Sequence, residues 1–161
     1  MIVLGVDPGT LHTGWGIVKR TGPRLSCVAA GVIHTQKGAE LHERLLTIFE
    51  GLSELVVAHQ PSCMAVEDVF SKHVRSALVL GQARGVVMVV GARAGLPVSS
   101  YAPALVKRSI AGSGQAPKGQ LGRIVGAILG LRELPSADAT DALAIAITHA
   151  NAVIVRRPPV R

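Results

Sequence analysis

Five acidic side chains occur at three separate points of a chain that is otherwise basic. These residues are Asp7, Glu67, Asp68, Asp138 and Asp141. Carboxylate oxygens are hard ligands of the kind Mg²⁺ prefers, and carboxylates brought together without a cation repel one another. Two such ions, about 3.5–4 Å apart, can activate water and stabilise the leaving oxygen in a displacement at phosphorus. If the fold gathers these acids, we expect metal-assisted cleavage of a phosphodiester bond.

Two of the acids follow short apolar runs that predict strands. Residues 2–6 are apolar and are closed by Asp7 and a Pro-Gly pair, and residues 64–66 predict a central strand with Glu67 at its end. If these strands are neighbours in one sheet, the two carboxylates meet at the same edge, where α/β sheets place their ligand sites. An ordinary turn after Asp7 is the alternative interpretation.

The last predicted helix supplies two more acids. Asp138 and Asp141 are three residues apart at its start, so they share one face of the helix. Packing this helix across the sheet would add both carboxylates to the site, although Asp138 can alternatively help to cap its own helix. Side chains alternate along a strand, so Asp68 should point to the opposite face of the sheet from Glu67. We therefore do not expect Asp68 to be a metal ligand.

The remaining pattern predicts a single α/β domain. Residues 15–18, 25–33 and 97–101 also favour strands, and residues 39–59, 76–93, 104–110, 119–129 and 139–153 favour helices. Three early antiparallel strands followed by alternating helices and strands predict a five-stranded mixed sheet flanked by helices on both faces. We expect one domain over residues 1–153 and a mobile basic tail over residues 154–161.

The charge distribution indicates a polyanionic partner. The chain of 161 residues has a formal net charge of +7, and residues 69–132 contain lysines and arginines but no acid. A surface of one sign favours phosphate binding, with a merely solvated basic face as the alternative. Cys27 and Cys63 are isolated and lack metal-ligand spacing. Without a secretory leader or ~18 uninterrupted apolar residues, we expect a cytoplasmic protein with no membrane partner.

Motifs in a fixed order carry a family resemblance. They are Gly5-Val6-Asp7-Pro8-Gly9-Thr10, Thr13-Gly14-Trp15-Gly16, Glu67 followed by Val69-Phe70, Leu80-Gly81-Gln82-Ala83-Arg84-Gly85, and Asp138-Ala139-Thr140-Asp141-Ala142-Leu143-Ala144. As an ordered set, from residue 1 to about residue 149, they resemble the RuvC-type Holliday junction resolvases, or crossover junction endodeoxyribonucleases.

The resemblance implies a fold, an activity and partners. The fold would be RNase H-like, and the activity would be that of a Mg²⁺-dependent endodeoxyribonuclease that cuts four-way DNA junctions by symmetric paired nicks in recombination and repair. The resemblance also implies a homodimer that cooperates with the RuvA–RuvB branch-migration complex. Its catalytic carboxylates would be Asp7, Glu67, Asp138 and Asp141, holding two Mg²⁺ ions for which Mn²⁺ can substitute.

Other residues gain expected roles in the same way. The residues expected to contact DNA are Phe70, Lys72, Arg75, Lys107 and Lys118. Phe70 would stack on unpaired bases, with core packing as the alternative, and the lysines would contact phosphate unless they are merely solvated.

The candidate dimer interface lies on the helix that carries Gly81, Gln82, Arg84 and Gly85. A junction has approximate two-fold symmetry, which matches a C₂ dimer with two equivalent active sites. A helix with several glycines can equally pack inside one subunit. Gly119 departs from the family pattern, because a polar residue is common after the lysine that corresponds to Lys118.

Three other functions fit parts of the sequence. Asp-Pro-Gly-Thr also occurs in the phosphate loop of actin-like ATPases, but those proteins duplicate the fold around a cleft. A non-catalytic junction-binding protein would not require the four acids. A related RNase H-like nuclease acting on ribosomal RNA precursor would not require the motif at residues 80–85 or Phe70.

Overall fold

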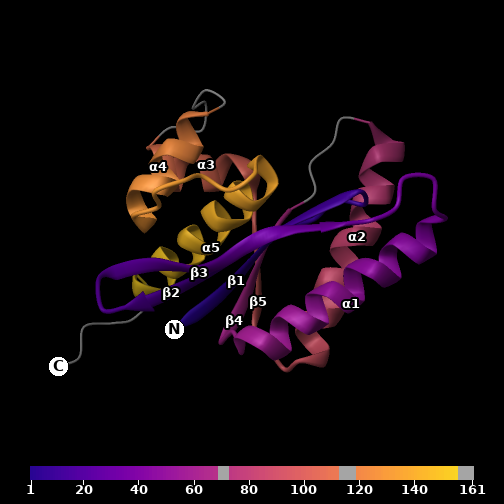
Figure 1. The fold of residues 1–161 in the computed structure, drawn as a ribbon, viewed down its shortest axis with the longest axis horizontal. Helices are drawn as coiled ribbons and strands as arrows, with labels where there is room; N and C mark the ends of the chain where they lie inside the picture. Colours follow the sequence, from indigo (N-terminus) through magenta and orange to yellow (C-terminus); the bar gives the residue numbers. More distant parts are fainter. Residues whose placement is uncertain (69–72, 113–118, 156–161) are drawn as a thin grey trace.

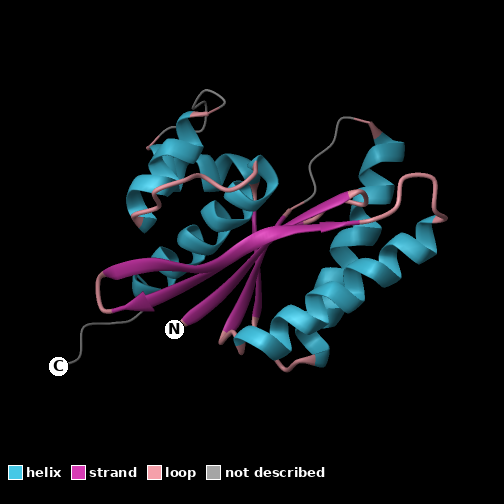
Figure 2. Cartoon of the chain, viewed as in Figure 1, coloured by secondary structure: helices cyan, strands magenta, loops and turns pink. Residues whose placement is uncertain are grey.

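The fold is a mixed five-stranded sheet with helices on both faces (Figures 1 and 2). The computed structural model describes residues 1–68, 73–112 and 119–155. The strands are β1 (Ile2–Asp7), β2 (His12–Thr21), β3 (Arg24–His34), β4 (Cys63–Glu67) and β5 (Val98–Tyr101). The helices are α1 (Leu41–His59), α2 (Val74–Arg93), α3 (Pro103–Ala111), α4 (Gln120–Leu129) and α5 (Ala137–Val155).

The strand order explains how distant residues reach one edge of the sheet. The order is β3-β2-β1-β4-β5, and the pairs β1–β2 and β2–β3 are antiparallel. The pairs β1–β4 and β4–β5 are parallel, so the carboxyl ends of β1 and β4 lie side by side. This arrangement confirms the predicted mixed sheet and the neighbouring positions of the first and fourth strands.

Several elements are longer than the sequence pattern predicted. The second strand was expected over residues 15–18 but runs His12–Thr21, because it pairs along its whole length with β3. The last helix was expected to end at residue 153, yet α5 runs to Val155. The predicted tail therefore begins as helix, since no proline or glycine interrupts the chain before residue 158.

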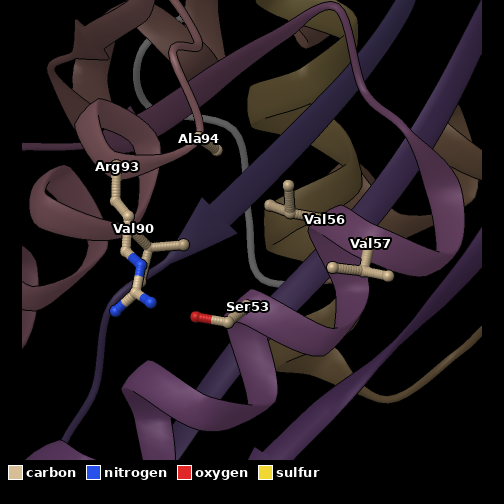
Figure 3. A pocket seen from close by; sticks show the side chains of 6 residues that line it. All are labelled: Ser53, Val56, Val57, Val90, Arg93 and Ala94. Carbon is tan, nitrogen blue, oxygen red and sulfur yellow. The ribbon is translucent and has the colours of Figure 1, made fainter.

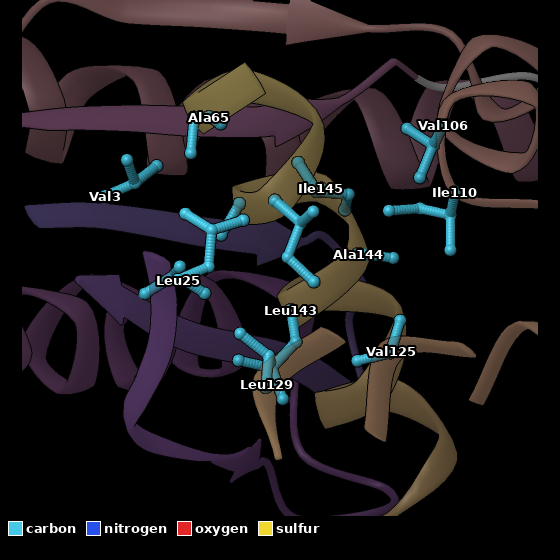
Figure 4. Close-up of a cluster of buried hydrophobic side chains, with 14 of the residues drawn as sticks. Val3, Leu25, Ala65, Val106, Ile110, Val125, Leu129, Leu143, Ala144 and Ile145 are labelled. Atoms are coloured by element: carbon cyan, nitrogen blue, oxygen red, sulfur yellow. The ribbon is translucent and has the colours of Figure 1, made fainter. Parts of the chain in front are cut away.

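Two hydrophobic cores lie on the two faces of the sheet, as the alternation of side chains along strands requires. One face carries Val3 and Ala65, which are fully buried against α5, with α3 and α4 packed outside it (Figure 4). The other face carries Leu4 and Met64, which are fully buried beneath α1 and α2. Consecutive residues of β1 and β4 consequently face different helices.

Helix α5 lies unusually close to the sheet because glycines leave room for its backbone. A Cβ atom on Gly5 would overlap the backbone carbonyl of Ala142 and would lie 2.9 Å from the Cβ of Ala146. A Cβ on Gly16 would lie 2.7 Å from Leu143 Cδ2. Real Cβ atoms do not approach other atoms this closely, so these glycines set the depth at which the last helix packs.

Local signals define the ends of the helices. The Glu43 carboxylate accepts a hydrogen bond from the backbone N–H of Glu40 at 3.0 Å, which satisfies a donor at the start of α1. Gln60 adopts a left-handed conformation at the other end of α1, directly before Pro61. Gly119 has a φ of 91° at the start of α4. This left-handed backbone explains why glycine replaces the polar residue expected there.

Helix α2 exposes an apolar face. Val74 is 75% exposed and Leu78 is 64% exposed, while a Cβ on Gly81 or Gly85 would meet nothing within 4 Å. Gly91 faces the other way, because a Cβ there would overlap Val98. The same helix therefore uses one glycine inside the subunit and presents two outward.

Helix α2 has 20 residues, and an 18-residue window within it has a mean hydropathy of 1.3, so by length and composition alone it could span a membrane. A single apolar helix is weak support for a membrane, because a face that packs on another protein has the same composition.

Candidate active site

Asp7 and Glu67 end neighbouring parallel strands on the same face of the sheet. Val6 and Val66 are paired in the register of β1 and β4, so the acids that follow them are adjacent. Both acids share the strand face of Val3 and Ala65, which is the face that α5 covers. The register therefore brings together two carboxyls that are 60 positions apart in the sequence.

Helix α5 adds the other two predicted acids. Asp138 lies in its first turn and Asp141 one turn further along, as expected from their spacing. A Cβ on Gly14, which pairs with Asp7 in the sheet, would overlap the backbone carbonyl of Asp138 and lie 3.2 Å from its Cβ. The start of α5 therefore rests directly on β2 beside the strand that carries Asp7.

The carboxyls perturb one another strongly. Burial, followed by the charges of Asp141 and Asp138, raises the pKa of Asp7 to about 6, while a hydrogen bond with Glu67 opposes this rise. Burial and the charges of Asp7 and Asp141 raise the pKa of Glu67 to about 8, and the hydrogen bond with Asp7 acts in the same direction. Without a cation, one proton is therefore held between these two side chains near neutral pH.

Asp141 and Lys107 complete one wall of the site. Burial and the charge of Asp138 raise the pKa of Asp141, whereas the ammonium of Lys107 acts to lower it. Lys107 also opposes the rise in the pKa of Glu67. A pocket of about 180 Å³ opens here, and it is lined by Glu67, Pro103, Val106, Lys107, Leu121 and Asp141. Lys107, which the sequence singled out only by resemblance, thus lies beside two of the carboxyls.

Hydroxyl groups hold the loop that follows Asp7. The buried Thr13 donates a hydrogen bond to the carbonyl of Gly9 at 2.6 Å. Thr35 donates to the carbonyl of Thr10 at the same distance. Neither contact is predictable from local sequence, because only the pairing of β2 with β3 brings Thr35 to the loop.

The neighbouring acid, Asp68, belongs to the opposite face, as predicted. Its carboxylate forms an ion pair with Arg84 of α2, with 2.8 Å between Oδ1 and Nη2. Arg84 was expected together with Gly81, Gln82 and Gly85 at an interface between subunits. Its guanidinium contacts Asp68 within the subunit, while the two glycines face outward.

The expected DNA contacts are placed only in part. Arg75 is exposed in the first turn of α2, and Lys107 lies in the carboxylate pocket. Phe70, Lys72 and Lys118 lie outside the described residues.

The donor set fits a hard divalent cation. All four acids offer only oxygen ligands. Burial first and neighbouring carboxylates second raise the pKa values of three of them, and a bound cation would favour their charged forms. Within residues 1–68, 73–112 and 119–155, no three acidic, histidine or cysteine side chains are already arranged as a metal site. Binding of a metal by both Asp7 and Glu67 would displace the proton that they share.

A second pocket, of about 180 Å³, lies between α1 and α2 (Figure 3). It is lined by Ser53, Val56, Val57, Val90, Arg93 and Ala94. The Arg93 guanidinium also lies 5.5 Å from the centre of the Phe49 ring. This pocket contains no carboxylate and is therefore separate from the acidic site.

The family model described as crossover junction endodeoxyribonuclease RuvC matches residues 3–149. The chain belongs to the RuvC family. RuvC of Geobacter metallireducens is 50% identical over 152 residues, covering 94% of this chain and 93% of its own length. RuvC of Geobacter sulfurreducens is 48% identical over 157 residues, covering 97% and 96% respectively.

The fold agrees with this assignment. T. thermophilus RuvC in complex with a Holliday junction substrate superposes with a TM-score of 0.90 and 36% identity, covering 96% of each chain. The RNase H-like fold predicted from the motifs is thus confirmed. RuvC proteins are metal-dependent endodeoxyribonucleases, so the chain is a nuclease rather than an actin-like ATPase or an inert binding module.

Proposed function

We propose that this RuvC-family endonuclease resolves four-way DNA junctions by symmetric paired nicks, in homologous recombination and DNA repair. The observation that carries the proposal is the meeting of acids from β1, β4 and α5 beside Lys107, in a chain whose basic residues dominate elsewhere. The solved relative in complex with a Holliday junction substrate supports the choice of substrate.

Asp7, Glu67, Asp138 and Asp141 would hold two Mg²⁺ ions, or Mn²⁺ in their place. When bound, such ions supply a nucleophile at neutral pH and stabilise charge on the leaving oxygen. Glu67 would bind the cation as a carboxylate, so it would release the proton that it shares with Asp7. With a pKa of about 8, Glu67 is only partly ionised at neutral pH without a cation. Lys107, beside Glu67 and Asp141, is positioned to attract the scissile phosphate and offset negative charge as the bond breaks.

Binding to the junction backbone would rest on the basic region without acids. Arg75 and Lys107 are the candidate phosphate contacts among the described residues, and Lys72 and Lys118 are candidates by sequence. Phe70 is proposed to stack on unpaired bases at the junction centre. Its position three residues after Glu67 would bring an aromatic ring close to the strand being cut.

The active form is proposed to be a homodimer in the cytoplasm. A C₂ dimer presents two identical sites to two equivalent strands, which accounts for paired nicks. The apolar face of α2, with Leu78, Gly81, Gln82 and Gly85 directed outward, is the proposed interface. Cooperation with the RuvA–RuvB branch-migration complex is proposed from family membership.

Cleavage of a labelled synthetic four-way junction tests the proposal directly. The reaction is compared with matched linear duplex, single-stranded DNA and structured RNA, each with Mg²⁺ and with EDTA. We expect paired nicks in two strands of like polarity, only in the junction and only with the cation. Binding without cutting would support a junction-binding protein, and cutting of RNA alone would support the ribosomal RNA nuclease.

A further inference from the structure

We propose that Arg84 is a positioning residue of the active site, which holds Asp68 away from the metal ligands and fixes the point where the chain leaves β4 beside Glu67. The inference rests on the proposed function, because it takes Glu67 to be a catalytic carboxylate. It assigns a role to an ion pair that the carboxylate chemistry itself does not use.

Consecutive acids at the end of β4 face opposite sides of the sheet. Glu67 points to the side of α5, where its pKa responds to Asp7 and Asp141. Asp68 contacts α2, on the other side. Because the two residues share one peptide group, any rotation of the backbone that moves one carboxylate also moves the other.

The Arg84 guanidinium connects three elements at this point. Its Nη2 donates to Asp68 Oδ1 at 2.8 Å and to Ser100 Oγ of β5 at 2.6 Å. The backbone N–H of Asp68 also donates to the carbonyl of Tyr101 at 2.9 Å. The chain just after Glu67 is thus held by β5 through its backbone and by α2 through its side chain.

The pair also removes a competing ligand. Asp68 lies next in sequence to Glu67, and its carboxylate offers the same kind of hard oxygen ligand. Arg84 neutralises that charge and is itself only 24% exposed. Acids are scarce in this chain, whose net charge is +7. One of these few acids, Asp68, forms an ion pair with Arg84.

The position of Arg84 further connects the site with the proposed dimer helix. Gly81 and Gly85, on neighbouring turns of α2, face outward, whereas Arg84 between them reaches inward to β4 and β5. A shift of α2 would therefore be transmitted to the residue after Glu67.

The test combines Asp68→Asn and Arg84→Met in a double-mutant cycle. Single-turnover cleavage of a Mg²⁺-loaded junction complex is measured beside the dissociation constant for the junction and the Mg²⁺ concentration at half-maximal rate.

We expect each single variant to cut about tenfold more slowly, since small misplacement of catalytic groups carries large rate losses. The double variant should be no slower than the slower single variant, because both changes remove one contact. Junction affinity should stay within about twofold, and half-saturating Mg²⁺ should rise.

Arg93→Met is the matched control, because it removes the same charge from the same helix but leaves Asp68 paired. It should cut at the wild-type rate. Arg84→Lys, which keeps the charge but replaces the planar guanidinium by a single ammonium group, should recover part of the lost rate.

Unchanged cleavage in Arg84→Met, or rate losses that multiply in the double variant, would overturn this inference while leaving the proposed function intact. A wild-type protein that does not cut junctions would instead overturn the proposed function itself. Sedimentation velocity measures whether each variant is a monomer or a dimer. If Arg84→Met is monomeric and Asp68→Asn is dimeric, Arg84 acts at the subunit interface and the positioning role is wrong.

Discussion

The backbone carbonyl of Asp138 occupies the space where a side chain on Gly14 would have to lie. Gly14 also pairs with Asp7 across β1 and β2. The absence of a side chain at one strand position thus allows a helix bearing two acids to approach a strand bearing a third. The geometry of the carboxylate site depends on this close packing as much as on the acids themselves.

Gly14→Ala should therefore damage both stability and cleavage. The added methyl group must displace the start of α5, and overpacking of this kind costs about 1–3 kcal/mol. The free energy of unfolding in urea measures the loss, and junction cleavage measures its effect on the site. Gly122→Ala is the control, because its Cβ would make ordinary contacts of 3.6 Å with Leu134 and Thr140. Equal stability of Gly14→Ala and Gly122→Ala would contradict the packing argument.

Asp7→Asn should abolish cutting without abolishing binding. Loss of a metal-binding carboxylate removes several kcal/mol of transition-state stabilisation, which corresponds to about a thousandfold or more in rate. Junction affinity should be unchanged or higher, because a negative charge near phosphate disappears. Gel-shift titration and single-turnover cleavage measure the two effects. Glu50→Gln, an exposed change on α1, should affect neither, and weakened binding by Asp7→Asn would count against the metal-site role.

The raised pKa values predict that the metal-free protein loses stability as pH increases. Asp7 and Glu67 bind protons more tightly in the folded chain than in the unfolded chain, with pKa values of about 6 and about 8 against 3.8 and 4.5. The folded state therefore holds more protons, so stability falls as pH rises from about 4 through about 8. Urea unfolding in EDTA at pH 5 and pH 8.5 measures this fall.

Glu67→Gln is the control for the pH dependence, because the amide cannot titrate. Its loss of stability between the two pH values should be smaller than that of the wild type. Mg²⁺ should stabilise the wild type more at pH 8.5 than at pH 5, since the ligands bind as carboxylates. Identical pH slopes in the two proteins would show that Glu67 does not carry the effect.

Lys107→Met should slow cleavage more than it weakens binding. Removing a positive group beside the reacting phosphate typically costs about a hundredfold or more in rate. The pH profile of cleavage should also move to higher pH, because Lys107 lowers the pKa of Glu67 and Asp141. Arg108→Met removes a neighbouring exposed charge and should leave the profile in place. If Lys107→Met changes only the affinity for the junction and does not shift the pH profile of cleavage, Lys107 contributes to DNA binding alone.

If the protein forms the proposed dimer through α2, Leu78→Glu should convert that dimer to a monomer. Leu78 is 64% exposed on the outward face of α2, and a buried carboxylate at an interface is strongly unfavourable. Sedimentation velocity measures the assembly state, and paired nicking of one junction should be lost with it. Leu46→Glu places the same charge on α1 at a side chain that is 55% exposed. If both variants remain dimeric, the interface lies elsewhere.

Local patterns made much of the fold predictable. Apolar runs that end at Asp7 and Glu67 indicate strands, because hydrophobic periodicity depends on neighbours in the sequence. The spacing of Asp138 and Asp141 placed them on one helical face for the same reason. The opposite orientation of Asp68 followed from strand alternation alone and is confirmed by its contact with Arg84.

Other features depended on contacts between distant segments. The inward direction of Arg84 and the hydrogen bond from Thr35 to the loop after Asp7 require a defined strand order and register. Motif spacing contains no such information, so it does not predict that Arg84 reaches Asp68 and Ser100 while Gly81 and Gly85 face outward.

The sequence by itself determined the acids, the basic surroundings and the family, because residue identity and local spacing suffice for these properties. Only the tertiary structure decided that Asp7 and Glu67 share a proton and that Lys107 moderates them, because pKa values depend on burial and on charges brought together through space. It also decided how closely α5 approaches the sheet. That distance results from glycines on β1 and β2 meeting a backbone more than a hundred residues away, a contact that neither segment specifies alone.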